Sequence, residues 1–319
     1  MPRYVLTVLL ALAAPAYALD CGGVEQEALQ WIDRMSRSLS TVSYQGVFTY
    51  EHGSTMQALR ISHSVDGNME SEQVTQLSGN HASIVRVAHP LDCVHPGHKI
   101  LRMGSNFDTG DGGCGLARYY RLKMSGEKRV AGRGAVVLQV LPRDMYRYGY
   151  ELALDRDTGL LLKSQTMARD GKILERFQFA DLSIGPVEVA GTRVDVVHHA
   201  GHPAAESHVD IEAPARAGEP RDWSVDWVPD GFALAASLAG AGHEQTYTDG
   251  LAVFSVFLEP ATPALEPGEG RARQGGTTAY TRGMHLAGQP VLVTVVGEVP
   301  VNTARIVADS VRWSDSGAD

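Results

Sequence analysis

The residues with the clearest capacity for chemistry lie between positions 93 and 114. Cys93, His95 and His98 fall within six residues, and Cys114 follows in the glycine-rich run GDGGCGL. These side chains could hold zinc, but structural zinc usually takes a second closely spaced pair of ligands, and Cys114 stands alone. A disulfide between Cys93 and Cys114 would close a loop of about 20 residues, worth roughly 3 kcal/mol. The spacing therefore favours a disulfide over a metal site.

The other histidines form no catalytic or metal-binding pattern. His243 and Glu244 resemble the start of a zinc-protease motif, but no second histidine follows at the required helical spacing. The densest imidazole group lies among alanine and proline residues, where solvated loop histidines are expected: His198, His199, His202 and His208. There is also no G-x-S-x-G motif, no Walker loop and no G-x-G-x-x-G motif opening a helix after a strand. We therefore predict no enzyme, no metal and no cofactor, and a hydrolase is the weakest alternative.

Two cations stand in a glycine-rich run, GEGRARQGG, at positions 268–276. Backbone N–H groups of such a run can cradle a phosphate, but a basic surface loop is the simpler interpretation. The wider segment 260–276 is rich in proline and glycine and is predicted to be an exposed loop. Its Arg271 and Arg273 are candidates for contact with a partner or a lipid headgroup.

The first 18 residues have the three parts of a secretory signal peptide. Arg3 supplies the positive charge, residues 5–14 the short apolar stretch and AYA at 16–18 the cleavage site. The mature chain should begin at Leu19 and be soluble in the periplasm, since no later apolar stretch approaches the roughly 20 residues of a membrane helix. An aspartate precedes Cys21 and disfavours lipoprotein processing, so we predict no acyl anchor and an unpaired Cys21.

Charge and length restrict the partners and the number of domains. Lys and Arg number 28 and Asp and Glu 37, so the net charge is 28 − 37 = −9. Without a cluster of Lys and Arg, such a chain is a poor ligand for nucleic acid, whose phosphates require cations. The mature chain of about 300 residues fits two domains of ~150 each.

The N-terminal part reads as one helix followed by a long antiparallel meander. Residues 25–41 place Leu29, Ile32, Met35 and Leu39 at helical spacing. From Tyr44 the apolar period changes to two, which is typical of strands. Further strands are predicted at 59–63, 72–77, 82–88, 134–141, 147–155, 159–168 and 173–182.

A linker separates this meander from a smaller C-terminal unit. Residues 199–222 lack apolar periodicity and are rich in Ala, Pro, Gly and charge. Strands are then predicted at 232–238, 244–248, 251–258, 277–282 and 291–297, followed by a closing helix at 300–311.

The order of several segments resembles the MucB/RseB family of envelope-stress regulators. In the C-terminal part these are WSVDWVPDGF, YTDGLAVFSVFLE, RQGGTTAYTRG and VTVVGEVPVNTARIVADSV. In the N-terminal part they are ALQWIDRMSRSLSTVSYQGVFTY and YRYGYELALDRDTGLLLKSQTMARDGKILERFQFADL.

The resemblance implies an α+β fold that is mostly antiparallel β. The large domain, 19–198, would be an unclosed β-barrel similar to lipoprotein carriers, with the small regulatory domain at 223–319. The protein would bind the periplasmic part of a transmembrane anti-sigma factor, protect it from site-1 proteolysis, and release it when lipid or lipopolysaccharide binds. A periplasmic lipid or lipoprotein carrier is the alternative, and we leave open whether the chain forms a homo-oligomer.

The resemblance also suggests roles for aromatic side chains, although core packing explains each one singly as well. The residues expected to line an apolar hollow for lipid are Phe48, Tyr50, Tyr146, Tyr148 and Tyr150. The residues expected to contact the anti-sigma factor are Arg271, Arg273, Trp227 and Phe232, because arginine and aromatic side chains often anchor interfaces.

Overall fold

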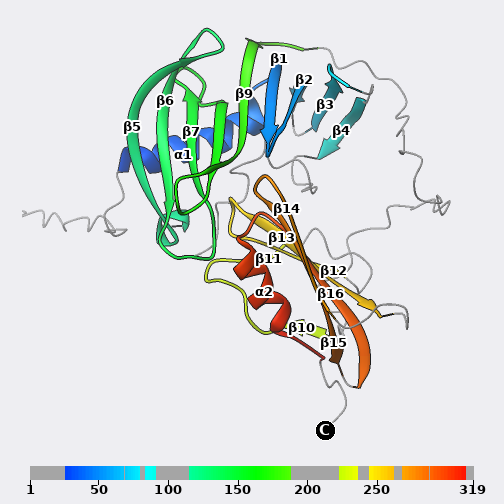
Figure 1. Ribbon diagram of the computed structural model, residues 1–319. Helices are drawn as coiled ribbons and strands as arrows, with labels where there is room; N and C mark the ends of the chain where they lie inside the picture. The colour runs from blue at the N-terminus through cyan, green and yellow to red at the C-terminus, as the bar shows by residue number, and fades with distance from the viewer. Residues whose placement is uncertain are drawn as a thin grey trace, which may run out of the picture.

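The computed structural model describes residues 26–67, 69–79, 83–90, 115–187, 223–235, 244–261, 268–286 and 288–313. These residues form a nine-stranded and a six-stranded antiparallel sheet, each with one α-helix (Figure 1). We call residues 26–187 the large domain and residues 223–313 the small domain. The predicted signal peptide, Cys21, the Cys93–Cys114 disulfide and the linker at 199–222 lie outside the described residues.

The large domain is an open, curved sheet. Its elements are α1 (Gln26–Thr41), β1 (Tyr44–His52), β2 (Thr55–Asp66), β3 (Met69–Gln76), β4 (Ser83–Pro90), the 3-10 helix η1 (Gly115–Arg118), β5 (Tyr120–Val130), β6 (Arg133–Pro142), β7 (Gly149–Asp155), β8 (Leu161–Met167) and β9 (Ile173–Ile184). The strand order is β4-β3-β2-β1-β9-β8-β7-β6-β5, and in the described part of the chain the two end strands do not pair. The prediction of an unclosed antiparallel barrel is therefore confirmed.

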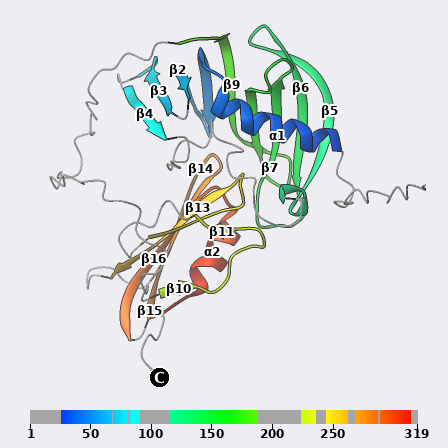
Figure 2. The ribbon, with the colours of Figure 1, turned by 180° about the vertical axis from the view of Figure 1, so that it is seen from behind.

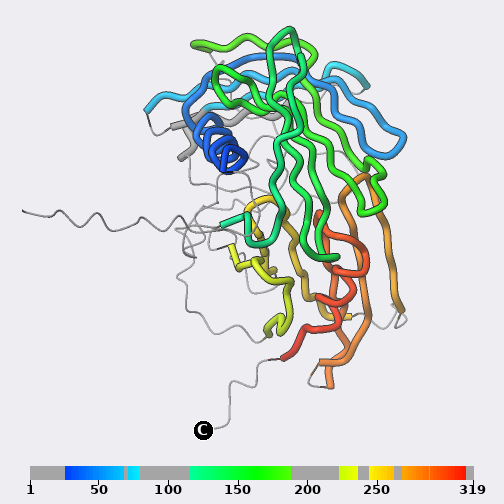
Figure 3. The backbone as a smooth tube through the Cα atoms, turned by 90° about the vertical axis from the view of Figure 1, so that its left-hand side faces the viewer, coloured from blue at the N-terminus to red at the C-terminus, as the bar shows by residue number. Residues whose placement is uncertain are grey.

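Helix α1 fills the inside of this curve (Figures 2 and 3). Ala28, Ile32, Met35 and Leu39 form its buried face and join the core of the sheet. Their three- and four-residue spacing places them on one side of a helix, which is why the sequence predicted this element almost to its ends.

The turn between β7 and β8 is fixed by the carboxylate of Asp155. Its Oδ1 accepts hydrogen bonds from the backbone N of Thr158 at 2.9 Å and from the Thr158 hydroxyl at 2.9 Å. Its Oδ2 accepts from Arg133 Nε at 2.5 Å. Burial alone would raise the pKa of Asp155, but the hydrogen bonds from Arg133 and Thr158 outweigh burial and lower it.

The small domain packs one helix against a twisted sheet. Its elements are β10 (Trp223–Val225), β11 (Ala233–Leu234), β12 (Glu244–Thr248), β13 (Val253–Pro260), β14 (Glu269–Gln274), β15 (Thr277–Leu286), β16 (Gln289–Gly297), α2 (Val301–Asp309) and β17 (Val311–Trp313). The sheet order is β11-β12-β13-β16-β15-β14, and β10 pairs separately with β17. Ala304, Val307 and Ala308 are the buried apolar residues that α2 contributes to the core.

Strands β14 and β5 were not predicted from the sequence. The prediction of a loop at 260–276 was wrong over its second half, because Glu269–Gln274 forms strand β14. This strand pairs with β15 around a turn at Gly275 and Gly276. A φ of +60° at Gly275 suits such a two-residue hairpin. Strand β5 was missed altogether. Both are edge strands. All residues of β14 are exposed, so it carries no apolar alternation, whereas β5 alternates buried Tyr120 and Leu122 with exposed Arg121 and Lys123 before a mostly exposed polar second half.

Candidate functional site

A buried arginine joins the two domains. Arg147, in the connection between β6 and β7, has no exposed side-chain surface. Its Nη1 lies 2.8 Å from Oδ2 of Asp249, which follows β12 in the small domain. Its Nη2 donates to the backbone O of Asp230 at 2.6 Å, and its Nε donates to Asp144 Oδ1 at 3.2 Å. Three hydrogen-bond partners therefore satisfy a charge that would be costly to bury alone.

Aromatic rings enclose the same guanidinium group. Its carbon lies 5.2, 5.4 and 5.1 Å from the ring centres of Tyr119, Tyr120 and Phe232, within range of cation–π attraction. The Tyr120 hydroxyl donates to Asp249 Oδ2 at 2.8 Å. Burial, reinforced by the negative charge of Asp249, raises the pKa of Tyr120 well above its ordinary value, so this hydroxyl stays a neutral donor.

Backbone contacts reinforce the junction between the domains. Gly231 packs so closely that a Cβ there would lie 2.4 Å from the ring of Tyr119. Leu251 of the small domain is buried in the core of the large one. At the tip of the β14–β15 hairpin, the N–H of Gly276 donates to Glu175 Oε1 at 2.8 Å. The junction is therefore supported at several separated points.

Two residues predicted to contact a partner lie at this junction. Trp227 packs edge-to-face on Tyr146, with ring centres 5.1 Å apart, and Phe232 is 7% exposed beside Arg147. In this arrangement both contact the large domain. Arg147 itself was missed by the sequence analysis, which read its position only as part of a tyrosine-rich strand.

The residues predicted to bind lipid are divided among three environments. Phe48 packs on other phenylalanines in the core of the sheet, and Tyr50 is half-buried in the same strand. Tyr146 and Tyr148 face the small domain, the latter beside Thr278 and Arg273. Tyr150 is 1% exposed, and its hydroxyl has no hydrogen-bond partner in the described residues.

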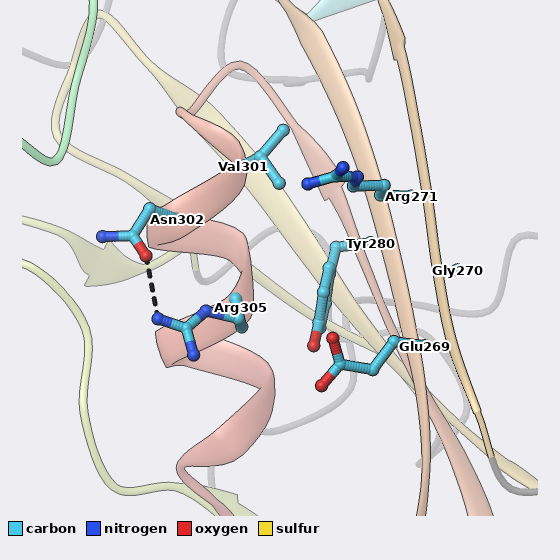
Figure 4. Close-up of a pocket in the computed structure, with 7 residues that line it drawn as sticks. All are labelled: Glu269, Gly270, Arg271, Tyr280, Val301, Asn302 and Arg305. Atoms are coloured by element: carbon cyan, nitrogen blue, oxygen red, sulfur yellow. Dashed lines mark hydrogen bonds between the residues drawn. The ribbon is translucent and has the colours of Figure 1, made fainter.

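A surface cleft in the small domain contains one of the predicted partner residues. It encloses about 390 Å³ between α2 and the strands β14 and β15. Figure 4 shows the side chains that line it. These are Glu269, Gly270, Arg271, Tyr280, Val301, Asn302 and Arg305. Of the four residues predicted to contact a partner, only Arg271 lies in this cleft, and Arg273 lies nearer to the large domain.

The described residues contain neither a cluster of three or more potential metal ligands nor a helix long and apolar enough to cross a membrane. The two sites described above are a guanidinium network between the domains and a polar cleft at a sheet edge.

Comparisons with known proteins place both domains in one family. The model of the MucB/RseB N-terminal domain matches residues 27–200, and that of the MucB/RseB C-terminal domain matches residues 217–312. The sigma factor AlgU regulatory protein MucB of Pseudomonas aeruginosa is 37% identical over 302 residues, which are 90% of this chain and 91% of that protein.

Solved structures agree with this assignment. The MucA/MucB complex of Pseudomonas aeruginosa contains a chain that is 34% identical, with a TM-score of 0.67 and coverage of 91% of this chain and all of that chain. MucB in complex with MucA(peri) is similar at 35% identity and a TM-score of 0.66, with the same coverage.

Proposed function

Because the chain belongs to the MucB/RseB family, we propose that it is a periplasmic regulator that binds the periplasmic segment of a transmembrane anti-sigma factor. The single observation that carries this proposal is the pair of solved complexes between MucA and a relative about 35% identical across nine-tenths of this chain. The family assignment covers both domains, so the proposal extends to the chain as a whole.

Binding would protect the anti-sigma factor from the first protease that attacks it. A protease needs its substrate in an accessible, extended form, and a segment held against another protein is withdrawn from that form. The sigma factor would then stay inactive for as long as the regulator remains bound.

Lipid bound in the large domain would lower the affinity of the protein for the anti-sigma factor. A lipid can shift an equilibrium only if it binds the two arrangements of the protein with different affinity. Tyr150 lies in the large-domain core, and its ring centre is 6.5 Å from that of Tyr120, which donates a hydrogen bond to Asp249 of the small domain. An acyl chain that displaced these tyrosines would also disturb Asp249, the partner of Arg147. Lipid binding in the core would therefore compete with attachment of the small domain.

A lipid or lipoprotein carrier is the second candidate function, and the unclosed sheet favours it. Carriage does not require a small domain anchored through the buried Arg147–Asp249 pair. Transfer of bound lipid from the protein to acceptor vesicles would support the carrier, whereas retention of lipid with loss of anti-sigma affinity would support the regulator.

The direct test is a calorimetric titration of the mature chain with the periplasmic segment of the anti-sigma factor from the same organism. We expect saturable binding that weakens when lipopolysaccharide is added. A lipid-independent affinity would remove the sensing step, and a lack of binding would refute the proposed function.

A further inference from the structure

Strand β14 forms an open edge of the small-domain sheet. Its residues are all exposed, and in the part of the chain that the structure describes no strand pairs with its outer side. Gln274 and Thr277 flank the two-residue turn and form a hydrogen-bonded pair. Along an antiparallel ladder, hydrogen-bonded and non-hydrogen-bonded residue pairs alternate. The N–H and C=O groups of Glu269, Arg271 and Arg273 therefore point away from β15. An incoming extended chain could use them as the next ladder of the sheet.

The cleft shown in Figure 4 lies beside this open edge. Helix α2 packs on β15 and β16, and the cleft lies where β14 extends past that helix. Tyr280, opposite Arg271 in the register, is 2% exposed; its hydroxyl lies beside the Glu269 carboxylate but makes no hydrogen bond of good geometry in the described residues. A buried polar group without a partner is costly unless a ligand satisfies it.

The cleft is positive although the chain is negative. Arg271 and Arg305 line the cleft with one carboxylate, that of Glu269, which gives 2 − 1 = +1 in a chain with a net charge of −9. Arg305 donates to Asn302 at 3.0 Å, whereas Arg271 makes no ion pair within the described residues. Two guanidinium groups and a phenolic hydroxyl are suited to bind a carboxylate.

A simpler interpretation is that Arg271 and Arg273 only protect an edge strand from aggregation, as charged residues often do. That role needs cations on the strand but explains neither the cleft nor the unsatisfied hydroxyl of Tyr280. The same edge also lacks a β-bulge, since the register of β14 with β15 is continuous.

We infer that an extended, acidic segment of the anti-sigma factor adds as a strand to β14 and places a carboxylate in this cleft. Its backbone pairs with the outward groups of Arg271, and its carboxylate accepts from the Tyr280 hydroxyl and is attracted by the two guanidinium groups that line the cleft. This inference rests on the proposed function and locates the partner on a specific surface.

The test is a calorimetric titration of the full mature chain with the periplasmic segment of the anti-sigma factor. Arg271→Gln removes the cation alone, and Arg271→Pro also removes the outward N–H, which an edge strand tolerates. Tyr280→Phe removes only the hydroxyl. Arg121→Gln, at an exposed position of edge strand β5 in the large domain, is the matched control.

We expect Arg271→Gln and Tyr280→Phe each to weaken binding about tenfold, and Arg271→Pro to weaken it further. Arg121→Gln should bind as the wild type does. Wild-type affinity in both Arg271→Gln and Tyr280→Phe would overturn the inference while leaving the proposed function intact, and these two variants decide the question even if Arg271→Pro misfolds. If these two variants lose binding to anionic vesicles while their affinity for the anti-sigma segment is unchanged, the cleft is a lipid headgroup site and the inference is overturned. If the wild type does not bind, the proposed function fails first.

Discussion

Replacing Asp249 with asparagine isolates the contact that holds the domains together. Oδ2 of Asp249 accepts from Arg147 and from the Tyr120 hydroxyl, both at 2.8 Å. Oδ1 accepts from the backbone N of Leu251 at 2.9 Å and of Ala252 at 2.7 Å, and so shapes the β12–β13 turn. Asparagine keeps Oδ1 and the turn, but it places an NH₂ group where Oδ2 faced two donors.

The loss of stability in Asp249→Asn depends on the partners that Arg147 keeps. Removing one partner of a buried ion pair costs about 3–5 kcal/mol. Asp144 Oδ2 still lies 3.0 Å from Arg147 Nη2, so we expect the lower end, about 3 kcal/mol. Glu127→Gln is the control, because Glu127 and its partner Arg156 are 60% and 52% exposed. Such a surface pair is worth about 0.2–1 kcal/mol.

Urea unfolding followed by tryptophan fluorescence measures this loss. Trp31 reports on the large domain, and Trp223, Trp227 and Trp313 report on the small one. We expect Asp249→Asn to unfold at lower urea than Glu127→Gln. A loss below about 1 kcal/mol for Asp249→Asn would mean that the pair contributes no more than a surface salt bridge, and the account of the junction would be refuted.

Three further predictions concern stability. Gly231→Ala should destabilise the chain by about 1–3 kcal/mol, because its Cβ would meet the Tyr119 ring at a φ of +89°; an unchanged urea midpoint would contradict this. Asp155→Asn should cost stability above about pH 4, the ordinary value for Asp. Because Arg133 lowers the folded-state pKa of Asp155, that cost should disappear as the pH falls through the lowered value, and a pH-independent cost would count against it. Cys93→Ser should lower stability by roughly 2–5 kcal/mol under oxidising conditions, because it removes the predicted disulfide with Cys114. A free Cys93 thiol in non-reducing peptide mapping would contradict this prediction.

Local patterns were enough to predict most of the fold. The helical spacing of Ile32 and Met35 predicted α1, and Asp249-Gly250 predicted the β12–β13 hairpin. Strand β14 was not predicted because all its residues are exposed, and β5 was not predicted although Tyr120 and Leu122 are buried, because its apolar alternation stops after Met124. Their register depends on the partner strand, which local composition does not report.

The junction between the domains could not be predicted in the same way. Arg147 and Asp249 are 102 positions apart, and each has a sufficient local explanation, one in a tyrosine-rich strand and the other in a turn. Only the three-dimensional arrangement shows that they pair without solvent. Trp227 and Tyr146 illustrate the same point: Trp227 was predicted to contact a partner and Tyr146 to line a hollow for lipid, and in the structure the two rings pack against each other.

We propose that the protein shields the anti-sigma factor from the first protease and releases it when lipid binds. The most direct measurement is the rate at which the first protease cleaves the anti-sigma periplasmic segment, with and without the mature chain. We predict that an equimolar amount of the protein slows cleavage and that added lipopolysaccharide restores the rate, whereas Asp249→Asn needs less lipid for the same effect. Equal cleavage rates with and without the protein, at concentrations where the segment is saturated, would contradict the account.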